Sequence, residues 1–219
     1  MKRFVQSTAA ALALFATSLP AAADDHRTMS GHFMHHMEAV FEFQGKNQHT
    51  EAIGYINTML NGGDLDLSPY ERAFLLQSRA NSYYSVDLLF EAIADFQAAI
   101  DTGSLTQDET FDRRRNIAQL QHLTGQMDAS IATYEQLMES GHPGTQESRF
   151  LRGLAQTYAM AEDWANASRT AEAFWAATPQ IDRDASDYRL AAFIFREAGD
   201  TDRADEITRE GQERFPHAQ

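Results

Sequence analysis

The fold is decided by a stretch between residues 80 and 100, which reads ANSYYSVDLLFEAIADFQAAI. Ala80 and Tyr83 fall on one stripe of a first helix, and Ala92 and Phe96 fall on one stripe of a second, because residues three or four positions apart share a helical face. This pattern predicts two short amphipathic helices that pack against each other.

The same arrangement recurs along the chain at a nearly constant period. Five small residues mark the second helix of each unit, and consecutive markers lie 40, 38, 37 and 37 residues apart. Because one unit cannot bury its apolar stripe alone, a fixed period of about 20 to 50 residues predicts stacked repeats. The markers are Ala52, Ala92, Ser130, Ala167 and Ala204, and their counterparts twelve residues earlier are Val40, Ala80, Ala118, Ala155 and Ala192.

Turn-forming residues and prolines separate these helices. Gly125-Gln126, Glu162-Asp163 and Gly199-Asp200 stand between paired helices. Prolines follow the markers by twelve or thirteen residues. Because proline cannot continue a helix, this position predicts the end of the second helix of each unit. Each unit is therefore expected to be helix, tight turn, helix and short linker. These prolines are Pro143, Pro179 and Pro216.

With these residues the chain resembles tetratricopeptide-repeat (TPR) proteins over roughly residues 33 to 218. It departs from the family pattern in its longer period and in its third unit, where Arg114 and Gln121 stand at positions expected to be apolar. The resemblance implies an all-α, right-handed superhelix of stacked helix-turn-helix repeats, with about five helix pairs. It also implies that the first helices line a concave groove that holds a protein or peptide partner.

The N-terminus has the pattern of a secretory signal. Lys2 and Arg3 precede an apolar run, and Ala21-Ala22-Ala23 offers a cleavage site of small residues. The run is shorter than the roughly 20 residues that span a bilayer, and no second hydrophobic stretch follows. We therefore expect a signal peptide over 1–23, a flexible tail over 24–32 and a repeat domain over 33–218, in a soluble product that is periplasmic or secreted.

Composition restricts the partners. The chain has 32 acidic and 18 basic residues and a net charge of −14, so a nucleic-acid partner is not expected, because phosphate binding needs clustered Lys and Arg. It has no cysteine, so packing rather than disulfides must stabilise it. We find no nucleophile motif, glycine-rich phosphate loop or HExxH pattern, and therefore expect no enzymatic activity.

A basic surface is expected in the groove of this acidic chain. Positions that project outward from the first helices carry five arginines, whose guanidinium groups bind carboxylates with two hydrogen bonds. The alternative is that these arginines pair with acids of adjacent helices and join the repeats. The candidate groove residues are Gln77, Asn81, Tyr84, Arg115, Gln119, Arg149, Arg152, Gln156, Arg189 and Arg196.

A cluster of histidine and methionine near the N-terminus suggests a second function. Imidazole and thioether ligands suit copper, so the alternative to a binding scaffold without cofactor is a protein that binds copper or nickel. Cleavage after Ala23 would also make His26 the third residue of the mature chain, where its imidazole and the free amine could bind the same metal ion. The cluster could instead be an ordinary part of the first helix and its tail. The candidate ligands are Asp24, Asp25, His26, His32, His35 and His36.

The last repeat has no capping helix after it in the sequence. Phe193, Phe195 and Ile207 are expected to form an apolar face there. Stacked repeats need a solvated end, so a homodimer through the C-terminal repeat is one way to cover that face.

Overall fold

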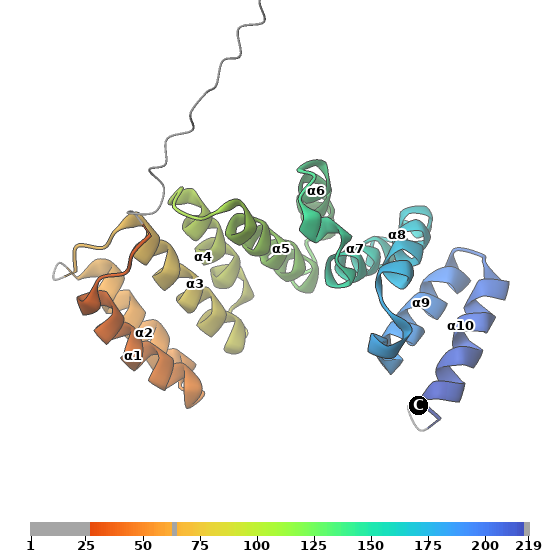
Figure 1. Cartoon of the computed structure of the whole chain (residues 1–219), viewed down its shortest axis with the longest axis horizontal. Coiled ribbons are helices and arrows are strands. Elements are labelled where there is room, and N and C mark those ends of the chain that lie inside the picture. The colour runs from red at the N-terminus through yellow and green to blue at the C-terminus, as the bar shows by residue number, and fades with distance from the viewer. Residues whose placement is uncertain (1–26, 63–64, 217–219) are drawn as a thin grey trace, which may run out of the picture.

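The computed structural model describes residues 27–62 and 65–216. Ten α-helices, two 3-10 helices and no strand occur in this part of the chain. Consecutive α-helices pair, and the pairs form an elongated row from α1 to α10 (Figure 1). The predicted all-α superhelix of stacked repeats is confirmed. The elements are α1 (Gly31–Gly45), α2 (His49–Asn61), α3 (Pro69–Ser85), α4 (Leu89–Asp101), α5 (Gln107–Leu123), α6 (Met127–Glu139), η1 (Pro143–Gln146), α7 (Ser148–Met160), α8 (Trp164–Ala177), η2 (Gln180–Asp182), α9 (Ala185–Glu197) and α10 (Thr201–Arg214).

The marker residues are the points at which paired helices touch. All five are completely buried, and so are four of their five counterparts on the first helices. At one crossing the contact is a hydrogen bond, in which the hydroxyl of Ser130 donates to the carbonyl of Ala118 at 2.7 Å. Small side chains at this position let the two helices pack closely, because the distance between helix axes depends on the size of the residues at the contact.

The turn inside each pair has the same geometry in all five repeats. One residue adopts a positive φ, between 58° and 87°, five positions before each marker. The N–H of the next residue donates to a carbonyl five residues earlier, as from Asp163 to Tyr158 at 2.9 Å, which closes the first helix. The three turns predicted from the sequence are among them. The residues are Asn47, Asp87, Gly125, Glu162 and Gly199.

The first helices of the five pairs are called the inner helices. The apolar core runs along the row and is formed by residues of both helices of the pairs. Its largest part joins the last three repeats, from Phe111 of α5 to Ile207 of α10. A separate cluster closes the N-terminal end, where Phe33, Met37 and Val40 of α1 are completely buried.

The repeat domain begins earlier than residue 33. The hydroxyl of Ser30 accepts a hydrogen bond from the N–H of Phe33 and caps α1, which starts at Gly31. Arg27 binds the carboxylate of Glu109 on α5 with two contacts of 2.8 Å. The N–H of Ser30 also donates to the carboxylate of Glu71 on α3 at 2.7 Å. Residues 27–32, expected in a flexible tail, therefore pack on the repeats because the carboxylates of Glu109 and Glu71 hold them. The predicted signal peptide, 1–23, lies outside the described residues.

The C-terminal repeat buries more of its apolar face than expected. Phe195 and Ile207 are buried, because α9 packs on both α10 and α8, whereas Phe193 remains 48% exposed. Among the described helices, none combines the length and hydropathy that a bilayer span requires.

Candidate peptide-binding groove

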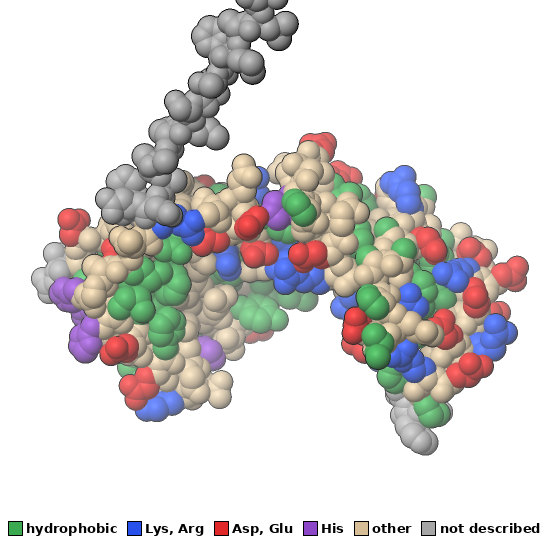
Figure 2. Space-filling view, viewed as in Figure 1, with side chains coloured by type: hydrophobic (Ala, Val, Ile, Leu, Met, Phe, Trp, Pro, Cys, Tyr) green, Lys and Arg blue, Asp and Glu red, His purple; other side chains and the backbone are tan. Residues whose placement is uncertain are grey.

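The predicted groove residues lie on the inner helices α3, α5, α7 and α9. Nine of the ten are at least partly exposed, and Arg115 is buried. In Figure 2, charged side chains of both signs gather over α5 and α7, whereas hydrophobic side chains gather over α1 and α3. The face in view thus changes from apolar to charged along the row.

One pocket brings together four of the predicted residues. It lies between α5 and α7 and has a volume of about 210 Å³. Its lining combines two amides and two guanidinium groups with His122 and Leu123, so it can hydrogen-bond a peptide backbone and hold a carboxylate. The four predicted residues are Gln119, Arg149, Arg152 and Gln156.

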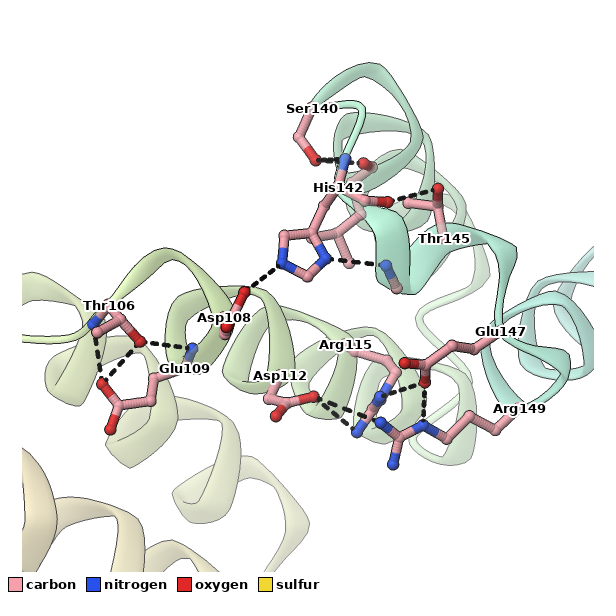
Figure 3. A network of polar contacts seen from close by, with 12 residues as sticks. Thr106, Asp108, Glu109, Asp112, Arg115, Ser140, His142, Thr145, Glu147 and Arg149 are labelled. Carbon is pink, nitrogen blue, oxygen red and sulfur yellow. Dashed lines mark hydrogen bonds and ion pairs between the residues drawn. The ribbon is translucent and has the colours of Figure 1, made fainter.

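Arg115 forms the centre of a polar network beside this pocket (Figure 3). Its guanidinium contacts Asp112 at 3.1 Å and Glu147 at 4.0 Å. Arg149 joins the same two acids, at 2.6 Å from Glu147 and 4.0 Å from Asp112. The network therefore connects α5 to the start of α7.

The buried position of Arg115 is electrostatically unfavourable. Burial lowers its pKa, and the positive charge of Arg149 lowers it further. Its Nε and Nη1 atoms have no hydrogen-bond partner, and an unsatisfied buried donor costs free energy. A carboxylate bound at the surface nearby would improve the electrostatic balance of this pair of arginines.

Arg152 binds the neighbouring repeat. Its Nε donates to the carboxylate of Asp187 at 2.9 Å, and its Nη2 donates to the hydroxyl of Ser186 at 3.0 Å. Arg196 pairs with Asp205 of α10 at 3.2 Å. For Arg152 and Arg115 the structure thus favours the alternative in which arginines join adjacent repeats.

Arg189 is the exception among the five arginines. It is exposed, and no residue of the described ranges forms a hydrogen bond or ion pair with it. It lines a second pocket of about 580 Å³ between α9 and α10, together with Arg196, Phe193 and Phe215. This guanidinium is therefore available to an external carboxylate.

The acids that hold the inner helices in place were missed by our sequence interpretation. Glu71, Glu109 and Asp187 each occupy the third position of an inner helix and form a capping box with the residue before it. Each also binds the preceding inner helix or its N-terminal flank. The motif of Ser, Thr or Asp followed three residues later by an acid would have identified all three.

Glu71 shows how tightly such an acid is held. Its carboxylate accepts hydrogen bonds from the N–H groups of Ser30, at 2.7 Å, and Ser68, at 2.9 Å. Burial alone raises the pKa of Glu71, but these hydrogen bonds outweigh it and leave the pKa below 4.5. The same carboxylate thus caps α3 and fixes the start of α1.

The predicted metal ligands fall into two groups. Asp24, Asp25 and His26 lie outside the described residues, whereas the three others lie on the first turns of α1. His35 faces Glu38 at 3.4 Å, while His32 and His36 face each other. Within residues 27–62 and 65–216, no group of three or more His, Cys, Asp or Glu side chains is placed to hold a metal ion.

Comparison with known proteins identifies the fold through structure alone. No protein-family model matches the sequence, and no curated protein matches it. MamA from Desulfovibrio magneticus RS-1 superposes with a TM-score of 0.69 at 11% identity, over 88% of this chain and 100% of that one. BtubC from P. vanneervenii superposes with a TM-score of 0.66 at 14% identity, over 80% of this chain and 76% of that one.

A third similar structure, YrrB, is described as a TPR protein with an unusual peptide-binding site. It superposes with a TM-score of 0.63 at 12% identity, over 84% of this chain and 86% of that one. The chain therefore has the TPR fold, as the resemblance of its residues implied.

Proposed function

We propose that this TPR-fold protein is a scaffold that binds a protein or peptide segment along its inner helices, through a carboxylate of that partner. The observation that carries the proposal is the pocket between α5 and α7, which collects two predicted arginines and two predicted amides. Amides hydrogen-bond both donors and acceptors of an extended backbone, and guanidinium groups bind carboxylates in a fixed geometry.

Arg149 and Arg189 are the two arginines suited to bind the partner. The side chain of Arg149 is 61% exposed, and its partner Glu147 is 47% exposed. An exposed ion pair contributes at most about 1 kcal/mol, so a carboxylate of the partner can replace Glu147. Arg152 is held by Asp187, so it shapes the pocket rather than binding the ligand directly.

The apolar half of the same face would receive the rest of the segment. Phe41 and Tyr84 are 45% and 55% exposed on α1 and α3. Aromatic rings of this kind bind partners with little loss of conformational entropy. The proposed ligand is therefore a segment with apolar residues next to acidic residues or a free C-terminus.

The proposal also covers location and chemistry. The pattern over 1–23 supports export, so we place the mature chain in a periplasm or outside the cell, without a cofactor or catalytic role. The exposed Phe193 and the pocket that it lines support a homodimer through the C-terminal repeat as a further possibility of assembly. The fold of MamA, BtubC and YrrB supports the scaffold role only in general terms.

Selection of random peptides on the immobilised mature chain tests the proposal. We expect the recovered peptides to share an acidic group or a free C-terminal carboxylate beside apolar residues. The variant with both Arg149→Glu and Arg189→Glu should bind the best peptide at least tenfold more weakly, since reversal adds repulsion to the lost attraction.

The matched control for each single reversal, Arg149→Glu or Arg189→Glu, is Arg209→Glu, the same charge change at an exposed position of α10. It should bind like the unmodified chain, and all variants should melt at similar temperatures. Undiminished peptide binding by the double variant would contradict the carboxylate site.

A further inference from the structure

Two histidines of α1 converge on each other at the N-terminal end of the row. His32 and His36 lie one helical turn apart on α1, so their side chains share a face. Their ring centres are 5.0 Å apart, whereas their Nε2 atoms are only 3.2 Å apart. The two rings therefore point their Nε2 atoms toward one region of space.

The distance between these nitrogens matches two ligands of one metal ion. Imidazole nitrogens bind zinc at about 2.1 Å, so two of them lie about 3.0 to 3.4 Å apart at square-planar or tetrahedral angles. The spacing of four residues on a helix is also the one by which two histidines of a single helix bind zinc. Neither ring needs to move far to accept an ion.

A third side chain orients His36. The hydroxyl of Tyr55 on α2 lies 2.7 Å from Nδ1 of His36. When Nδ1 carries the ring proton and donates it to Tyr55, Nε2 of His36 keeps a free lone pair for the metal. Tyr55 itself packs against Phe43 of α1, with ring centres 6.2 Å apart.

The surroundings leave the other coordination positions open. A pocket of about 120 Å³ adjoins His36 and is lined also by Tyr55, Thr58 and Met59. His32 is exposed, so solvent reaches the pair from the other side. The net charge of −14 favours the approach of a cation.

We propose that His32 and His36 form a binding site for one divalent late transition metal ion, with Tyr55 as the positioning residue. Two imidazoles and solvent suit Cu²⁺, Ni²⁺ and Zn²⁺, and Cu²⁺ should bind most tightly in this series. The site lies on α1, apart from the arginines of the proposed groove, and does not depend on them.

Titration of the mature chain with Cu²⁺, followed by calorimetry and electron paramagnetic resonance, tests the site. One extra residue before Asp24 removes the competing amino-terminal chelate that His26 would complete. We expect one equivalent to bind with two imidazoles in the coordination sphere. His32→Ala or His36→Ala should weaken binding at least tenfold, and Tyr55→Phe about tenfold, as for other residues that orient a ligand.

His35→Ala is the matched control, because His35 lies on the same helix and faces Glu38 instead. It should bind Cu²⁺ like the unmodified chain. Circular dichroism should show the same helix content for every variant, since all three histidines lie on the surface side of α1. Equal affinity of His32→Ala, His36→Ala and the unmodified chain, or a signal from a single imidazole, would overturn the proposal.

Discussion

The junction between α5 and α7 is built differently from the other three junctions between inner helices. At the others, the capping-box acids Glu71, Glu109 and Asp187 also accept a hydrogen bond from the preceding inner helix or its N-cap, namely from Ser30, Tyr70 and Arg152. The corresponding position of α7 is Phe150, and its N-cap residue is Glu147. An arginine network takes the place of the missing acid.

The difference shows what one carboxylate can do in a stack of repeats. A capping acid is short, is held by backbone N–H groups, and loses little conformational entropy when it binds a second partner. The network at α7 uses the long side chains of Arg115 and Arg149, and two donor atoms of Arg115 have no hydrogen-bond partner. Of all consecutive α-helices, α6 and α7 also make the sparsest contact. We therefore expect this junction to be the least stable one.

The largest expected effect separates the two kinds of junction directly. Glu71→Ala removes a charged acceptor from two partly buried backbone N–H groups and should lower the free energy of unfolding by about 3 kcal/mol. Glu147→Ala removes an exposed ion pair with Arg149 and a longer contact of 4.0 Å with the buried Arg115, and should cost only about 1 kcal/mol. Urea unfolding of both variants measures the difference, and equal losses would contradict the distinction between the junctions.

A second prediction concerns the close approach of the Tyr134 side chain of α6 to the backbone of α7. A Cβ atom at Gly153 of α7 would overlap the hydroxyl of Tyr134 on α6. Gly153→Ala should therefore destabilise the fold by about 1 to 3 kcal/mol, despite the higher helix propensity of alanine. Thermal unfolding provides the measurement.

Gly54→Ala is the control for this prediction, since no atom lies within 4 Å of a Cβ at Gly54 in α2. It should stabilise the protein by up to about 1 kcal/mol. Adding Tyr134→Phe to Gly153→Ala should restore part of the lost stability. A Gly153→Ala protein that is as stable as the unmodified chain would show that the helices can separate without cost.

The third prediction uses pH to probe the same junction. Burial lowers the pKa of His122, which lies on α5 and contacts Thr157 of α7 at 3.2 Å. The unfolded chain then binds the proton first, so stability should fall as the pH decreases below about 6.5. The contributions of Glu71 and Glu109, whose pKa values are lowered, should be lost only as the pH falls below 4.5.

Urea midpoints measured from about pH 2.5 to about pH 8 separate these two ranges. His122→Gln should flatten the curve just below pH 6.5 and leave the acid limb unchanged. An unaltered slope in that variant would mean that another group causes the loss.

The smallest effect concerns the turns, which are alike in all five repeats. Glu162 adopts a φ of 58°, where a residue with a Cβ is disfavoured. Glu162→Gly and Asp87→Gly should each stabilise the fold by about 0.5 to 1 kcal/mol in thermal unfolding. Similar gains on both sides of the α5–α7 junction would show that the turns are alike, so that the repeats differ in their junctions and not in their turns. A loss of stability would argue against the turn geometry.

Much of the fold could be predicted because its signals are local. Every marker residue is buried as its spacing requires, and each predicted turn contains a residue with positive φ. The third repeat was harder to predict from the sequence, because Arg114 stands where an apolar residue was expected. The structure exposes Arg114 to solvent and buries Arg115, so α5 presents a different residue to the core.

The candidate groove was predicted only in part for a related reason. Helical periodicity assigns residues to a face, and nine of the ten candidates are at least partly exposed. It does not say whether an arginine on that face meets a carboxylate from the next repeat. Arg152 meets Asp187, whereas Arg189 meets none in the described ranges.

The sequence by itself determined the number of helix pairs, three of the five turns within them, and the small residues that are buried at the repeat period. These features depend on spacings of three to twelve residues, which lie within a single pair of helices. Only the tertiary structure decided which arginines join repeats, which acids have two partners, and that His32 and His36 converge with support from Tyr55. Those contacts depend on the distance and rotation between neighbouring helices, because a long side chain binds whichever partner packing brings within reach.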